Sequence, residues 1–308
     1  MKRLTTHEWI AHFLASEPPR SKSLVMTIFG DAVVPHGGQV WLGSLIRLAA
    51  PFGLSDRLVR TSVFRLAQEG WLAASRDGRR SAYAIDADAQ PRFERANHRI
   101  YSPLETHWDG RWTLLIAGAA DIPAPARAQV RKELLWEGYA LVAPGVLGHP
   151  AGQAEVLEEI IGRAGLKGKL LAVTAGEMPQ VSTRPLRDLV RDGWDLSGVM
   201  AGYDHFIETF APLRALLDKG AALEAEEAFV IRTLLVHAYR RVQLHDPMLP
   251  VELLPSPWPG AQAYELARAI YRHTFGAADD NVLQLMRDED PATPTASASF
   301  YDRFGGLR

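Results

Sequence analysis

The first third of the chain alternates apolar and polar positions with the period of a helix. Apolar residues recur three and four positions apart, so each segment gains one apolar face. Prolines and glycines separate the segments, and Ser55 and Gly70 are residue types that cap the start and the end of the last one. This pattern predicts helices at 4–15, 21–34, 42–49 and 55–69.

After Gly70 the period shortens to that of extended chain. We expect strands at 71–75 and 81–85, joined through Asp77-Gly78, a dipeptide typical of tight hairpins. Another short extended run, 39–41, precedes the helix at 42–49. The order of three helices and a hairpin is that of a winged helix-turn-helix. We place this domain, with an additional N-terminal helix, within residues 1–87.

The predicted helix 55–69 has two opposite faces. At about 100° per residue, Val59, Ser62, Val63 and Leu66 fall on one side, suited to packing. The opposite arc, about 140° wide, is almost free of acid and carries Arg57, Arg60, Thr61, Phe64, Arg65 and Gln68. Arginine, threonine and glutamine are residue types that contact phosphates and base edges in the major groove. We expect the hairpin or helix 42–49 to cover Phe64.

A solvated surface helix has the same polar face, so this helix alone does not decide between the two interpretations. The hairpin favours DNA, because its tip is basic and such tips meet phosphates or the minor groove. The predicted DNA contacts are Ser55, Arg57, Arg60, Thr61, Arg65, Gln68, Arg76, Arg79 and Arg80.

The rest of the chain predicts an α+β protein. A helical linker at 88–110 is followed by alternating strands and helices over 111–182, typical of a ferredoxin-like fold. We expect strands at 112–118, 139–143 and 169–174 and helices at 123–136 and 154–164. Residues 183–308 are predicted to be a helical domain, with helices at 184–192, 202–218, 223–244 and 260–275 and a flexible tether at 288–299.

Charge is distributed unevenly along the chain. Residues 1–110 contain 14 basic and 11 acidic residues, a net of +3, whereas residues 111–308 have a net of -5. Residues 55–80 contain six arginines and only three acidic residues, so basic charge is concentrated where a nucleic-acid contact would need it. The chain has no cysteine, which fits a reducing cytoplasm. We expect neither a membrane span nor a signal peptide.

Several irregular runs extend over nearly the whole chain, and helix or strand periodicity does not force them. They lie at 37–45, 59–66, 69–72, 78–81, 108–112, 239–241, 246–250, 252–255, 258–260 and 303–307. Together these runs resemble the PaaX-type repressors of phenylacetic acid degradation. The resemblance implies a homodimeric repressor that phenylacetyl-CoA, its effector, releases from operator DNA. It also implies a winged helix, a Cas2-like (ferredoxin-like) middle domain and a helical C-terminal domain for effector binding and dimerisation.

An aryl-CoA effector needs an apolar slot for its ring and cations for its phosphates. The predicted effector contacts are Tyr203, His237, Arg240, Arg241 and Trp258. In the alternative interpretation, Arg240 or Arg241 pairs with Asp246 or Glu252 and holds the proline-rich loop. A different acyl-CoA or an aromatic acid also remains open as the effector.

We expect no catalytic residue, no metal and no cofactor. The ten histidines lack the HxH, HxxH and HExxH spacings, and no P-loop, G-x-S-x-G or G-x-G-x-x-G sequence is present. One alternative belongs to another class. Asp121, after the first strand of a nuclease-like fold, could bind a divalent metal in a nuclease, although as a cap for the helix at 123–136 it needs no metal.

Overall fold

The computed structural model describes residues 5–103, 107–117, 122–182 and 184–307. Its contacts divide the chain into two compact units. Unit 1 contains Met1–Pro103, His205–Arg241 and Gln262–Arg308, and unit 2 contains Leu104–Asp204 and Val242–Ala261. Unit 1 therefore combines the start of the chain with most of its C-terminal helices. The boundaries at 87, 110 and 182 follow the linear order and stay a prediction.

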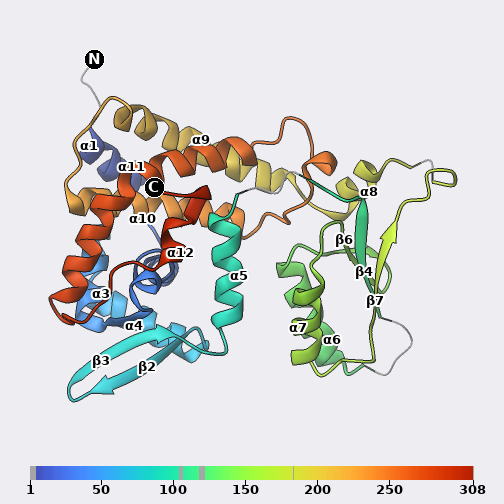
Figure 1. Cartoon of the computed structure of the whole chain (residues 1–308), viewed down its shortest axis with the longest axis horizontal. Coiled ribbons are helices and arrows are strands. Elements are labelled where there is room, and N and C mark those ends of the chain that lie inside the picture. Colours follow the sequence, from blue (N-terminus) through green and yellow to red (C-terminus); the bar gives the residue numbers. More distant parts are fainter. Residues whose placement is uncertain (1–4, 104–106, 118–121, 183, 308) are drawn as a thin grey trace. The chain divides into compact units, whose positions relative to one another are not determined.

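Unit 1 begins with a winged helix-turn-helix (Figure 1). Its helices are α1 (Thr6–Ser16), α2 (Ser21–Ile28), α3 (Leu42–Ala49) and α4 (Asp56–Gln68). Its strands are β1 (Gln39–Trp41), β2 (Leu72–Asp77) and β3 (Arg80–Ile85), in an antiparallel sheet of order β1-β3-β2. Helix α4 packs on α2 and α3, and the buried Leu24, Ile28 and Leu45 contribute to the core. The predicted winged helix is confirmed.

The predicted helix 21–34 is not regular throughout. A π-helical turn, Phe29–Val33, and a 3-10 turn, Val34–His36, follow α2. The chain then leaves through Gly37, whose φ of +89° suits glycine. Turns of this π type often mark special sites. Here the turn holds Asp31 inside unit 1, where side chains from other segments bind it.

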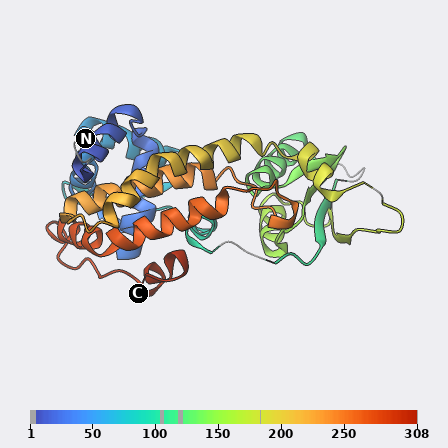
Figure 2. The same cartoon turned by 90° about the horizontal axis from the view of Figure 1, so that it is seen from above.

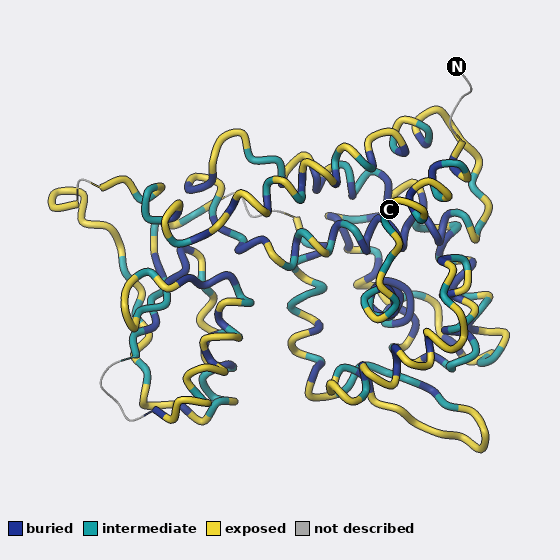
Figure 3. Tube along the Cα trace, turned by 180° about the vertical axis from the view of Figure 1, so that it is seen from behind, coloured by how far each residue is buried: buried dark blue, intermediate teal, exposed yellow. Residues whose placement is uncertain are grey.

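The β2–β3 hairpin is exposed along β2 and its turn (Figure 3). Asp77 pairs with Arg80, so Gly78 and Arg79 form a two-residue turn. Gly78 has φ +58°, the left-handed backbone that such turns require at this position. Only Leu72 on β2 is buried, which anchors the base of the hairpin and leaves its tip in solvent.

Most of the rest of unit 1 consists of the shorter α5 (Gln90–Tyr101) and of three long helices, whose ends at 197–204, 242–243 and 260–261 belong to unit 2. These helices are α9 (Ser197–Leu217), α10 (Ala225–Gln243) and α11 (Gly260–Arg287), and within unit 1 they run alongside one another (Figures 1 and 2). Phe206 of α9 contacts Tyr239 of α10 with ring centroids 5.3 Å apart. Phe229 of α10 meets Phe52, after α3, at 5.8 Å, so these helices share a core with the winged helix.

The segment 288–299 is not the flexible tether expected from its composition. Its Pro294 carbonyl accepts a hydrogen bond, 3.0 Å long, from the buried His36, and Ser297 N donates to the Pro35 carbonyl. Thr293 is buried, and α12 (Ala298–Tyr301) follows. Composition predicted flexibility, but contacts with the turn after α2 hold the segment in place.

Unit 2 contains the ferredoxin-like fold. Its order is β4 (Arg111–Ile116), α6 (Ala124–Trp136), β5 (Ala140–Ala143), β6 (Val146–His149), α7 (Ala154–Arg163) and β7 (Leu171–Gly176). The sheet is antiparallel in the order β5-β6-β4-β7. Helices α6 and α7 cover one face around Leu134 and Ile160. Strand β6 was not predicted, because four residues next to Gly145 are too short to establish an alternation.

The other face of this sheet packs against α8 (Leu186–Gly193) and the segment after α10. Trp112 of β4 contacts Trp194 with ring centroids 6.1 Å apart, and the Trp194 indole donates to the Gly138 carbonyl. Leu249 and Leu253 complete this core. Side chains therefore pack on both faces of the sheet, whereas the edge strand β7 is mostly exposed.

Candidate nucleic-acid interface

Helix α4 has the two faces that its sequence predicts. Val59, Val63 and Leu66 are at most 2% exposed and pack into the winged helix. The Ser55 hydroxyl accepts a hydrogen bond from Leu58 N, which caps the first turn. Ser55 therefore has a structural role at the start of α4, whatever it contacts in addition.

The opposite face of α4 is exposed and basic. Arg57, Arg60, Arg65 and Gln68 are exposed, and in the described part of the chain their side chains make no hydrogen bond or ion pair. The Thr61 hydroxyl donates to the Arg57 carbonyl at 2.8 Å, so its oxygen remains available as an acceptor. Three cations on one face thus have no intramolecular partner among the described residues.

The expectation that the hairpin or α3 covers Phe64 is wrong. Its side chain is 59% exposed, because neither element extends over this part of α4. Leu58, in the first turns of the same helix, is 46% exposed. The basic face therefore includes a large apolar ring.

The hairpin adds two cations to this surface. Arg79 occupies its turn and Arg76 lies on β2, and neither side chain has a partner in the ranges that the structure describes. Helix α4 contacts β2, so the hairpin lies beside this helix (Figure 1). We call Arg57, Arg60, Arg65, Arg76 and Arg79 the basic face.

Arg80 differs from these five arginines. Its guanidinium lies 4.4 Å from the centre of the Trp41 ring and donates to the Glu289 carbonyl at 3.0 Å. Arg76 and Arg80 are four residues apart in sequence but lie on the two strands, with Arg76 opposite Ser81 and Arg80 opposite Asp77. Successive pairs point to opposite faces of a hairpin. Arg80 is thus engaged with Trp41 and Glu289 within unit 1, and its DNA contact stays a prediction.

Known protein families match this sequence, including the part that forms α4 and the β2–β3 hairpin. Three family models match: PaaX-like protein at residues 20–89, the PaaX protein central Cas2-like domain at 105–190, and the PaaX-like protein C-terminal domain at 194–284. The chain belongs to the PaaX-like protein family. It is 36% identical over 308 residues to the transcriptional repressor PaaX of Escherichia coli K12, covering 100% of this chain and 96% of that protein.

A solved structure also aligns with this PaaX-like chain. It is the uncharacterized protein Rv0674 from Mycobacterium tuberculosis, with 24% sequence identity and a TM-score of 0.47. The alignment covers 81% of this chain and 96% of the other. Family membership rests on the sequence matches.

Among the predicted effector residues, His237 and Arg240 bind the winged helix. His237 is buried with its Nδ1 atom 3.0 Å from Thr27 Oγ1, and Arg240 Nη1 donates to Thr27 Oγ1 and to the Ser23 carbonyl, both at 3.1 Å. Burial, together with the charges of Arg240 and Arg241, lowers the pKa of His237 to about 3. The contacts of Arg240 are on α2 and not on Asp246 or Glu252.

Tyr203 and Trp258 contact each other in unit 2, with ring centroids 5.9 Å apart. The buried Tyr203 hydroxyl lies 2.7 Å from Gln243 Oε1 and 2.6 Å from Asp246 Oδ2. His237, Arg240 and the exposed Arg241 belong to unit 1. The contacts of Tyr203, His237 and Arg240 stabilise the helices that carry them, and an effector contact at these five residues stays a prediction.

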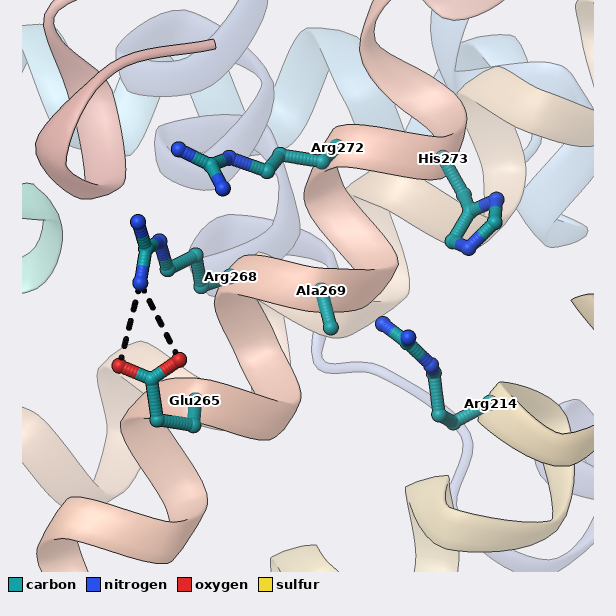
Figure 4. A pocket seen from close by; sticks show the side chains of 6 residues that line it. All are labelled: Arg214, Glu265, Arg268, Ala269, Arg272 and His273. Carbon is teal, nitrogen blue, oxygen red and sulfur yellow. Dashed lines mark hydrogen bonds and ion pairs between the residues drawn. The ribbon is translucent and has the colours of Figure 1, made fainter. Parts of the chain in front are cut away.

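A hollow of about 290 Å³ in unit 1 is better suited to bind an anion than the predicted effector residues are (Figure 4). Arg214 points into it from α9, and Arg268, Arg272 and His273 line it from α11. The remaining lining residues are Glu265 and Ala269. Sequence reasoning missed this set, although the spacing of Arg268 and Arg272 by four residues puts them on one side of a helix.

The cations of the hollow are only partly neutralised. Arg268 pairs with Glu265 at 3.3 Å, and Arg214 pairs with Asp218 at 2.7 Å. The hydrogen bond from Arg214 lowers the pKa of Asp218, which therefore stays ionised. Arg272 donates to the uncharged carbonyl of Gly306. Guanidinium groups suit phosphate oxygens through their fork geometry.

A buried charged cluster joins the winged helix to the C-terminal helices. Asp31 is completely buried and lies 2.8 Å from Arg232 of α10 and 3.1 Å from Arg303. Tyr101 and Tyr271 donate to Asp31 Oδ1 at 2.9 and 2.8 Å. Burial raises the pKa of both tyrosines, which keeps them protonated as donors. We call these five residues the Asp31 cluster.

Three further expectations concern metals, catalysis and membranes. Asp121, the candidate metal ligand of a nuclease, lies outside the described residues. Across the described ranges, no group of three or more histidine or carboxylate side chains is arranged to hold a metal ion. Nor does any helix there have both the length and the apolar character needed to cross a membrane.

Proposed function

We propose that this protein is a transcriptional repressor of phenylacetic acid catabolic genes and binds operator DNA in the cytoplasm through α4 and the β2–β3 hairpin. The observation that carries this proposal is the basic face, whose five arginines are exposed and have no partner in the described part of the chain. The name of its relative, transcriptional repressor PaaX, supports the same function. Helix α4 would enter the major groove with Arg57, Arg60, Thr61, Arg65 and Gln68. The hairpin would reach the backbone or the minor groove with Arg76 and Arg79.

We also propose that the repressor is a homodimer whose two α4 helices contact the half-sites of an inverted repeat. Its effector would be phenylacetyl-CoA, as the family resemblance implies, with the phosphates of its CoA part bound in the hollow between α9 and α11. The guanidinium groups of Arg214, Arg268 and Arg272 support this placement, since the phosphates of CoA need cations. Analytical ultracentrifugation tests the dimer, and a monomer at the concentrations that bind DNA would contradict it.

Fluorescence anisotropy with the DNA upstream of the gene tests the function. We expect tight, salt-sensitive binding, which Arg60→Ala and Arg65→Ala each weaken by about tenfold because each removes a base or phosphate contact. Lys132→Ala is the matched control, since it removes an exposed cation from α6 in unit 2. Equal losses in all three variants would show that binding is only nonspecific attraction. No preference for this DNA over an unrelated fragment, even at low salt, would exclude the repressor.

A further inference from the structure

Phe64 is the one large aromatic side chain within the polar arc of α4. Single exposed apolar side chains are common on proteins, so an exposed fraction of 59% alone carries little information. Its position carries more, because Arg60 and Arg65 flank it and no described residue neutralises them. The ring thus lies within the surface that would face an anionic partner.

The spacing along α4 gives the ring a defined position. Arg57, Arg60, Thr61 and Phe64 follow the pattern i, i+3, i+4, i+7, which aligns four side chains in one stripe. Recognition helices present base-contacting residues to the major groove with this spacing. With a rise of about 1.5 Å per residue, Phe64 lies about 10 Å beyond Arg57 along the helix, a distance of about three base-pair steps.

We propose that Phe64 selects thymine by packing its ring against the C5-methyl group in the major groove. This proposal rests on the proposed function, in which α4 enters that groove. The thymine methyl is the apolar group that base pairs expose there, and a phenyl ring has no group that could bond to the other base edges. A second copy of this chain is a poorer partner for the ring, because two basic faces would repel each other.

Replacing thymine by uracil tests the methyl contact directly. Uracil removes the C5-methyl and keeps base pairing. The DNA is the upstream fragment that the wild-type protein protects from nuclease, prepared with thymine or with uracil. We expect uracil to weaken wild-type binding by about fourfold for each methyl that a Phe64 ring contacts, the factor that corresponds to burying one methylene.

Phe64→Ala should bind both fragments equally and as weakly as the wild type binds the uracil fragment. Its dependence on salt should not change, because no phosphate contact is lost. The variant should fold, since the ring is exposed. Leu58→Ala is the matched control: it shortens another exposed apolar side chain of α4, just outside the arc, and should retain the wild-type preference for thymine.

Three results would overturn the proposal. In the first, Phe64→Ala keeps the full preference for thymine, so that the methyl acts elsewhere or through DNA shape. In the second, the wild type binds both fragments equally. In the third, Phe64→Ala loses affinity only by weakening self-association, seen in ultracentrifugation, so that the ring contacts a second copy. If the wild type binds neither fragment specifically, the proposed function itself fails, and this result is distinct from the other three.

Discussion

At the scale of single residues, burial fixes the protonation state of His237. The imidazole is enclosed between Thr27 and Arg240, and a second cation, Arg241, is close enough to oppose a further positive charge. These surroundings lower its pKa from 6.5 to about 3. His237 is therefore neutral in the folded protein and contributes to the packing of α10 on α2.

This low pKa predicts a loss of stability in mild acid. Below pH 6.5 the unfolded chain takes up a proton at His237, whereas the folded protein does not until about pH 3. Stability from this group is complete above pH 6.5 and declines as the pH falls, by about 2 kcal/mol between pH 8 and pH 5. We measure the free energy of unfolding in urea at pH 8 and at pH 5. Between these pH values, His237→Asn should lose less stability than the wild type. Parallel losses in the two proteins would exclude this role.

At the scale of elements, the two arginines next to each other at the hairpin tip should differ in function. Arg79 has no partner in the described part of the chain, whereas Arg80 binds Trp41 and Glu289. We expect Arg79→Ala to weaken operator binding and to reduce the slope of log K against log salt by about 1, as for one lost phosphate contact.

Arg80→Ala serves as the matched comparison. It should lower the free energy of unfolding by about 0.5–1 kcal/mol, because a half-exposed cation–π contact and a hydrogen bond are lost, and leave the salt slope unchanged. Anisotropy titrations over a range of salt concentrations, with thermal unfolding of both variants, separate the two effects. If Arg80→Ala reduced the salt slope and Arg79→Ala did not, Arg80 would be the DNA contact and Arg79 would not.

Elements with a strong local pattern could be predicted from the sequence, and elements decided by distant contacts could not. Helix α4 was predicted to within one residue at each end, because its caps and its period agree. The four-residue strand β6 has no readable period, and its pairing with β4 is a tertiary contact. The same limit applies to the site. Periodicity located Arg60 and Arg65, but only the fold shows that Arg80 is engaged, that Phe64 is exposed and that α9 supplies Arg214 to a hollow on α11.

At the scale of the whole molecule, unit 1 contains both the proposed operator surface and the proposed effector site. Helix α11 links them physically. Arg272 lines the hollow, and the adjacent Tyr271 donates to Asp31 in the π-helical turn that follows α2. A ligand that shifts α11 would therefore disturb the Asp31 cluster, which holds the winged helix through buried charges that are costly to separate. An effector shifts the equilibrium between the DNA-bound and DNA-free arrangements only if it binds the DNA-free arrangement more tightly than the other.

The last prediction follows from this link. Phenylacetyl-CoA should release the protein from operator DNA, and Arg268→Ala should require about tenfold more ligand for release while binding DNA normally in its absence. Arg241→Ala tests the sequence-based assignment in the same assay and should respond like the wild type. Because coupling is reciprocal, operator DNA should weaken phenylacetyl-CoA binding by the same factor by which the ligand weakens DNA binding, as measured by calorimetry. Arg268→Ala with a wild-type response would place the ligand outside the hollow, whereas a wild type that ignores phenylacetyl-CoA would remove it as the effector and leave the DNA contacts of α4 unaffected.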